Sequence, residues 1–372
     1  MTPSSQLPRW VDIFLLPLLN LLTAFFICGL IIAALGENPF TALNVLIKGA
    51  FVYPGSLGYT LYYTTNFIFT GLAVAIAFHA MMFNIGGEGQ AYIGGLGAGL
   101  IALWLGSFLP ALIVIPLAVA AAALFGAAWA FIPGYLQAKR GSHIVITTIM
   151  FNFIASSLMV WLLAGPLLQP GQQSPQTRLF EESAHLAKFT DIAKWFSIDA
   201  ANSPLNLSFI IALFALVFFW ILVWKTRFGY ELRAVGHNPD AAHYAGINVP
   251  RTVIIALALS GAFAGLMATN EILGVQHKVL LNFTSGYGFT GIAVALMGRN
   301  HPVGIFLASL LFGALYQGGA ELDFEFKSIT REMVLVIQGM IILFSGALAY
   351  MYQPFLERHL SRYFNRKEAA NV

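Results

Sequence analysis

The chain has 372 residues, of which 58% are hydrophobic and only 9% are charged, and its mean hydropathy is +0.77. A soluble domain of this length would carry about a quarter charged residues, so polar surface is too scarce for a globule in water and the composition predicts a membrane protein. The net charge of +3 comes without a basic stripe, which argues against nucleic-acid binding. Cys28 is the single cysteine, which excludes intrachain disulfides and cysteine metal clusters.

Apolar stretches follow one another along the whole chain, and a helix needs about 20 such residues to cross the hydrocarbon of a bilayer. The candidate spans are 13–36, 60–82, 90–108, 111–132, 143–168, 207–225, 252–272, 286–299, 302–319 and 333–352. The first resembles a secretory signal, but it is too long and lacks a clean cleavage site, so we interpret it as a retained anchor. The eighth is short, which favours a broken or tilted helix. The predicted fold is all-α and polytopic, with about ten transmembrane helices.

The distribution of lysine and arginine predicts the orientation, because short cytoplasmic loops carry an excess of both. If the N-terminus is cytoplasmic, most of the 19 basic residues fall in segments on the cytoplasmic side. Both termini, including the tail 353–372, are therefore expected in the cytoplasm, and the long connection 169–206 is expected outside it.

Five candidate spans precede this connection and five follow it. An odd number per half means that related halves would have inverted topology. The stretches GGEGQAYIGGLGAG (86–99) and GYGFTGIAVALMG (286–298) support such a relation, because each opens a helix with glycines after a polar break. Residues 1–372 are thus expected to form a single membrane domain, with one half at about 13–168 and the other at about 207–352.

A polar segment follows the second candidate span, and its glycines would interrupt a helix. Irregular backbone at membrane depth is tolerated only against protein or a water-filled cavity, so this segment is a candidate part of a substrate pathway. The candidate residues are Phe83, Asn84, Glu88, Gln90 and Tyr92. The polar ones offer hydrogen bonds to hydroxyls or base edges, and the aromatic ones offer stacking for a planar ligand. A cytoplasmic turn with a solvated Glu88, and aromatic residues that only pack, are the alternatives.

Asn270 and Glu271 end the seventh candidate span. An inverted repeat would place them on the outer side of the same pathway. The alternative is a helix end whose long side chains reach towards water. For Thr147, Thr148 and Asn152, hydrogen bonding between helices is a sufficient explanation without a ligand.

The stretch GHNPDAAHYAGI (236–247) predicts a short, capped helix in a cytoplasmic loop. Asn238 suits the N-cap, Pro239 the first helical position, Asp240 the positive end of the helix dipole and Gly246 a left-handed C-cap. About two turns of helix are not stable alone, so this one must pack on something. Its narrow, alanine-rich body fits a groove in another protein, and packing on its own chain is the alternative.

Three stretches together resemble the permease subunits of bacterial ABC importers of the ribose and branched-chain amino-acid type, with nucleoside permeases as the most similar branch. They are FNIGGEGQAYIGG (83–95), AKRGSHIVITTIMFNFIA (138–155) and RAVGHNPDAAHYAGINVPR (233–251). The first is fairly specific to the nucleoside branch, and the third is shared across the superfamily. Their order, and the layout of spans around them, extend the resemblance over nearly the whole chain.

The resemblance implies that the loop at 236–247 holds a coupling helix, which docks in a cleft of a separate ATPase subunit. The residues expected there are Gly236, Asn238, Pro239, Asp240, Ala241, Ala242, Tyr244, Ala245 and Gly246. No Walker A pattern occurs in the chain, so ATP would be used by the partner, and no cofactor or metal is expected on this subunit. A second related permease or a second copy, and an extracytoplasmic substrate-binding lipoprotein, complete the expected assembly in the inner membrane of a bacterium.

The sequence therefore favours a transport subunit that moves nucleosides with energy from a separate ATPase. The same machine carrying a simple sugar such as ribose is one alternative, and an ion-driven secondary transporter is another. A membrane-embedded enzyme is disfavoured, because the chain has no HExxH, GxSxG or CxxC motif.

Overall fold

The computed structural model describes Val11, residues 15–195 and 201–347, Tyr352 and Leu356. Over these residues the protein is built from helices, and its β-structure is limited to two isolated bridges, Gln176 with Leu280 and Lys188 with Asn206. The predicted all-α class is confirmed for this part of the chain. The tail expected at 353–372 lies outside the described residues except for Leu356.

The chain forms two compact units, one of Met1–Gly49 with Gly318–Val372 and the other of Ala50–Gln317. These units do not coincide with the two predicted halves at about 13–168 and 207–352. The two halves remain a prediction.

In the first unit, α1 (Leu16–Ala34) packs against α14 (Arg331–Ala347), and the Cys28 Sγ lies 3.7 Å from the Ile337 carbonyl oxygen. The chain then turns through 118° into α2 (Pro39–Phe51). Gly36, with φ of 86°, forms this turn, and Asn38 Oδ1 accepts from the amide of Phe40 at the start of α2. Sequence analysis had no element in this position.

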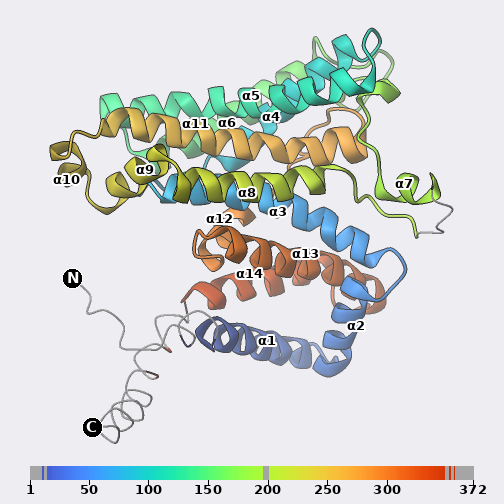
Figure 1. The fold of residues 1–372 in the computed structure, drawn as a ribbon. Helices are drawn as coiled ribbons and strands as arrows, with labels where there is room; N and C mark the ends of the chain where they lie inside the picture. Colours follow the sequence, from blue (N-terminus) through green and yellow to red (C-terminus); the bar gives the residue numbers. More distant parts are fainter. Residues whose placement is uncertain (1–10, 12–14, 196–200, 348–351, 353–355, 357–372) are drawn as a thin grey trace, which may run out of the picture. The chain divides into compact units, whose positions relative to one another are not determined.

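The second unit contains most of the helices, both long and short. They are α3 (Ser56–Phe78), α4 (Gly87–Leu105), α5 (Ala111–Arg140), α6 (Ile144–Ala164), α7 (Phe189–Trp195), α8 (Ser208–Lys225), α9 (Arg227–His237), α10 (Pro239–Tyr244), α11 (Val249–Ala268), the π-helical η3 (Thr269–Gln276), α12 (Tyr287–Met297) and the first part of α13 (Pro302–Glu325). Figure 1 shows α10 and α7 at opposite ends of this unit.

Glycines allow α4, α5 and α11 to approach backbone to backbone. A Cβ added at Gly261 would meet the carbonyl oxygen of Gly126, and one at Gly265 would meet that of Ala122. A Cβ at Gly94 of α4 would in turn meet Gly265. Small residues at such positions let helices pack closely in a membrane, where hydrophobic driving force between helices is absent.

Six helices of the described chain are long and apolar enough to cross a membrane, and a seventh span is added if the bent α1–α2 pair counts as one. The six are α3, α5, α6, α8, α11 continued by η3, and α13. Large apolar side chains such as Phe153 and Trp161 of α6 and Phe214 of α8 are exposed on their outer faces, as lipid contact requires. Every predicted range overlaps a helix, but ten membrane-crossing helices and inverted halves remain predictions.

Candidate functional site

The short helix α10 forms as its sequence predicts. Asn238 is the N-cap, and its Oδ1 accepts from the Ala241 amide at 3.0 Å. Pro239 occupies the first helical position, and Gly246 follows the helix with φ of 82°. These local signals suffice because caps and turns depend on residues only a few positions apart.

One residue attaches α10 to its own chain, while most of its surface faces away from it. Ala242 is 3% exposed and packs in an apolar cluster with Ile144 of α6 and Val253 of α11. In contrast, Tyr244 is 92% exposed. The other exposed predicted residues are Asn238, Pro239, Asp240, Ala241, Ala245 and Gly246. The helix α10 thus packs on its own chain through Ala242, as one interpretation predicts. The rest of its surface is exposed, as docking in a groove of another protein would require.

Gly236 lies at the base of α10, in a second helix that sequence analysis treated as loop. This helix, α9, is capped by Thr226, whose Oγ1 accepts from the Gly229 amide at 3.0 Å. Gly236 is packed directly against the carbonyl oxygen of His79, at the end of α3. The ring of His79 lies 5.3 Å from that of Trp224 at the end of α8. Arg233 of α9 also donates to the Val223 carbonyl oxygen of α8 at 2.9 Å, so α9 connects α10 to the ends of two long helices.

The polar break at 83–92 forms a closed hydrogen-bond network with α11. Asn84 Nδ2 donates to Gln90 Oε1 at 3.0 Å and to Ser260 Oγ at 2.8 Å. Asn84 Oδ1 accepts from the Gly86 amide at 2.8 Å. Asn84 and Gln90 are each 1% exposed, so this network holds the interrupted backbone inside the protein.

Glu88 joins the first turn of α4 to the first turn of α12. Its Oε1 accepts from the Gly286 amide at 2.9 Å and its Oε2 from the Gly288 amide at 2.8 Å. These amides belong to the positive end of α12, where a carboxylate is stabilising. Gly288 is packed against the backbone of Glu88, so the two helix starts lie in contact. Glu88 is therefore bonded within the protein and does not sit in a solvated turn.

The two aromatic candidates beside this break contact other rings. Phe83 stacks on Phe78 with ring centroids 5.2 Å apart. Tyr92 is packed edge-on against Phe283, and its hydroxyl accepts from the Asn282 amide at 3.0 Å. Thr148 and Asn152 of α6 bond across to the same break, since Asn152 Oδ1 accepts from the Gly89 amide at 2.9 Å and Ile85 donates to Thr148.

Asn270 and Glu271 lie in η3, where they face α3. Glu271 Oε1 accepts from the Tyr62 hydroxyl at 2.5 Å and from Asn66 Nδ2 at 2.7 Å. Asn270 Nδ2 donates to Asn66 Oδ1 at 2.8 Å, and its Oδ1 accepts from Asn206 Nδ2 at 2.9 Å. All five side chains are buried, so Glu271 lies inside the helix bundle and not at a helix end in water.

Aromatic rings lie next to this polar cluster. The ring of Tyr63 is 6.4 Å from that of Tyr287 and 5.6 Å from that of Tyr316. Phe67, one turn further along α3, is packed edge-on against Tyr287 at 5.6 Å and against Tyr316 at 4.9 Å. Sequence analysis missed these residues and also missed Tyr62 and Asn66. The signal available was the pair Tyr62 and Asn66, two polar side chains four positions apart within a candidate membrane span.

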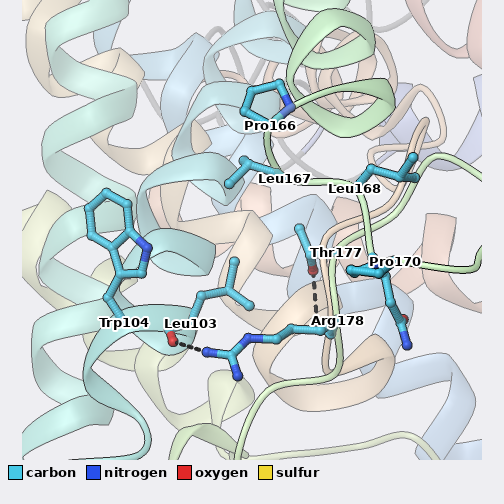
Figure 2. A pocket seen from close by; sticks show the side chains of 9 residues that line it. Leu103, Trp104, Pro166, Leu167, Leu168, Pro170, Thr177 and Arg178 are labelled. Carbon is cyan, nitrogen blue, oxygen red and sulfur yellow. Dashed lines mark hydrogen bonds between the residues drawn. The ribbon is translucent and has the colours of Figure 1, made fainter.

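A pocket of about 210 Å³ opens at the end of the unit that carries the long connection. Figure 2 shows Trp104 at the end of α4, Pro166 after α6 and Arg178 of the connection around it. The guanidinium of Arg178 donates to the Leu103 carbonyl oxygen at 2.7 Å, which ties the connection to α4.

The fold and the buried polar clusters together define a multi-pass membrane protein with a short, capped helix that is largely exposed. The sequence profile of the family described as branched-chain amino acid transport system / permease component matches residues 56–346, and the chain belongs to this family.

Individual relatives are similar over most of their lengths. The chain is 38% identical to a nucleoside ABC transporter permease of Lactococcus lactis, over 89% of this chain and 90% of the relative. It is 36% identical to a guanosine ABC transporter permease of Bacillus subtilis, over 89% and 92%. A glucose ABC transporter permease of Haloferax volcanii is 33% identical, over 92% and 89%. No solved structure matches the chain significantly.

Proposed function

We propose that this chain is the permease subunit of an ABC importer that carries nucleosides across the cell membrane. The relatives named as nucleoside and guanosine permeases support the substrate class, because each matches the chain over 89% of its length. The subunit catalyses no covalent step in this proposal, and it binds no cofactor of its own.

The observation that carries the mechanism is the exposed face of α10. Asp240, Ala241, Tyr244 and Ala245 point away from the chain, while Ala242 and the cap at Asn238 hold the helix in place. In the proposal this face docks in a cleft of a separate ATPase subunit. ATP-driven movement of that subunit reaches α3 and α8 through α9, because Gly236 lies against the end of α3.

The proposed assembly also contains a second permease, either related to this chain or a second copy of it, and an extracytoplasmic substrate-binding lipoprotein. Both termini lie in the cytoplasm of a bacterial cell with this chain in the inner membrane, and the connection 169–206 lies outside. The position of α7 and α10 at opposite ends of their unit supports this orientation (Figure 1).

Ten membrane-crossing helices in two inverted halves, within one permease domain of residues 1–372, remain part of the proposal. The contact between the starts of α4 and α12 supports it, because each is the glycine-rich helix start of one predicted half. Inverted repeats of this kind carry substrate sites near their interface.

The proposed pathway passes the candidate residues on the two sides of the membrane. They are Phe83, Asn84, Glu88, Gln90 and Tyr92 on one side and Asn270 and Glu271 on the other. The burial of Asn84, Gln90, Asn270 and Glu271 supports the proposal, because polar groups are costly inside a membrane and are typically retained for function.

Uptake of a labelled nucleoside by cells that express the whole importer tests the proposed function. We expect competition by unlabelled nucleosides and no competition by ribose or glucose. The glucose permease among the relatives favours a sugar as the second candidate, which predicts the reverse pattern. Uptake that survives inactivation of the ATPase, and that stops when the membrane potential is collapsed, would instead indicate a secondary transporter.

A further inference from the structure

The π-helical segment η3 brings a carboxylate and an amide to the same face of the bundle. In this wider helix, Asn270 and Glu271 both point at α3, where Asn66 contacts each of them. Short π-helical segments within α-helices are frequent at functional sites. The segment therefore places an amide and a carboxylate side by side in the interior of the protein.

Glu271 is a buried carboxylate whose partners are neutral donors. Neither the ion pair of Lys194 with Asp191 nor that of Arg227 with Glu231 includes it. A carboxylate is costly at such depth, and the Tyr62 hydroxyl and the Asn66 amide reduce the cost by donating to the same oxygen. The site thus accepts two adjacent donors at one carboxylate.

The same faces of the helices carry a wall of aromatic rings. Tyr63 and Phe67 of α3 form it with Tyr287 of α12 and Tyr316 of α13, at centroid separations of 4.9 to 6.4 Å. The ring of Tyr63 lies 5.1 Å from that of Tyr62, so the wall adjoins the polar cluster directly. Stacking of a base on aromatic side chains stabilises all bases similarly. Hydrogen bonds to the edge of the base therefore have to provide any discrimination between bases.

We propose that Glu271, together with this aromatic wall, is the point of the pathway that discriminates between bases, and that it favours a base whose edge carries two neighbouring N–H donors, as guanine does. This inference rests on the proposed function. The carboxylate accepts both donors, and the wall stacks on the ring.

In this structure the Tyr62 hydroxyl and the Asn66 amide occupy the hydrogen bonds to Glu271 that the substrate would make. During passage the base displaces the Tyr62 hydroxyl and the Asn66 amide, and its own N–H groups take over the bonds to the carboxylate. Adenine and cytosine present one donor beside an acceptor nitrogen, and uracil presents one donor between two carbonyl oxygens. Each of these edges sets an acceptor against the carboxylate oxygens, which is repulsive.

The test compares maximal uptake rates of guanosine and cytidine, each at saturating concentration, by the whole importer with Glu271→Gln. Saturation of the external binding protein removes its own preference from the comparison, so the remaining difference arises in the membrane. Glutamine keeps the size of the side chain but replaces one acceptor oxygen by a donor. We expect the guanosine rate to fall by about tenfold relative to the cytidine rate, as for loss of a bidentate contact to a base.

Glu182→Gln, which removes an exposed carboxylate from the connection, is the matched control and should leave the ratio unchanged. Tyr63→Leu should lower both rates together, because stacking is common to all bases. The inference is overturned if Glu271→Gln leaves the ratio unchanged, whether both rates are retained or both fall equally. Failure of the proposed function has a different signature, because then the unsubstituted importer takes up neither nucleoside.

Discussion

The carbonyl oxygen of His79, at the end of α3, lies directly against Gly236 of α9, in the space that a side chain at position 236 would fill. The Nε2 of the same histidine is 3.1 Å from the carbonyl oxygen of Asn300, between α12 and α13. Three parts of the chain therefore meet at the base of α10.

Gly236→Ala tests this junction. The added methyl group has no room against the backbone of α3, and overpacking of this kind costs about 1–3 kcal/mol. We expect a lower temperature of unfolding in detergent and weaker coupling between ATP hydrolysis and uptake. Gly339→Ala is the control, because a methyl group there meets open space within a helix. Equal behaviour of the two variants would contradict the close contact at Gly236.

Tyr244→Ala tests docking of α10 on the ATPase. Tyr244 is 92% exposed, so its loss should leave the stability of the chain unchanged. A tyrosine at the centre of an interface contributes about 2 kcal/mol or more, so co-purification of the ATPase should fall clearly. Tyr59→Ala, at the beginning of α3 and so away from α10, serves as the control. Retained co-purification and normal transport with Tyr244→Ala would contradict docking through this face.

Substitution by leucine is expected to have different effects at Ala242 and at Ala245. Ala242 is buried, so the larger side chain must push α10 away from α6 and α11 and lower the thermal stability. Ala245 is exposed, so the same substitution should preserve stability and reduce only ATPase binding. Thermal unfolding and co-purification measured side by side separate the two effects, and identical profiles would show that α10 packs differently.

Glu88→Gln should loosen the start of α12. Glutamine offers one acceptor oxygen where the carboxylate offers two, and the charge that favours the helix N-terminus is lost. Hydrogen bonds to charged groups contribute about 1.5–3 kcal/mol, so faster hydrogen exchange is expected at the amides of Gly286 and Gly288. Unchanged exchange at these amides would argue against the carboxylate as their acceptor.

His277 makes the stability of the second unit depend on pH, at the end where the long connection 169–206 lies. Its pKa is lowered from 6.5 to about 4, mainly by burial and to a smaller extent by the neighbouring His185 and Lys188. The unfolded chain therefore binds a proton that the folded chain does not, and stability present above pH 6.5 is lost as the pH falls towards 4.

His277→Asn tests this linkage. Residue 277 has a φ of 54°, and asparagine tolerates this left-handed backbone better than most residues. Thermal unfolding measured at several pH values should show a smaller loss of stability on acidification than in the unsubstituted chain. His237→Asn, at an exposed position, is the control and should keep the full pH dependence.

Local sequence signals predicted α10 accurately, because Asn238, Pro239 and Gly246 act on residues within one or two turns. The positions of the long helices also followed from composition, since apolar length alone determines them. In contrast, α9 was missed because its polar residues, including Arg227 and Glu231, resemble a loop within so apolar a chain.

The partners of Glu271 were beyond sequence analysis. Tyr62 and Asn66 lie 209 and 205 positions before it in the chain, and their contact with it depends on how the helices are packed. The same holds for Glu88, whose acceptor role depends on the amides of Gly286 and Gly288 far along the chain. The sequence shows that Glu88 and Glu271 are carboxylates in an apolar chain, but only the fold shows which groups donate hydrogen bonds to them.

Where α5 and α11 pass each other at Gly126, Gly261 and Gly265, backbone meets backbone with no interlocking side chains. Related sequences are therefore expected to keep glycine here, because even the Cβ of alanine would meet the facing main chain, however far the lipid-facing residues of the same helices diverge. A larger residue at one of these sites would have to move the two helix backbones apart, because the closest atoms that it would meet are main-chain oxygens that no substitution removes.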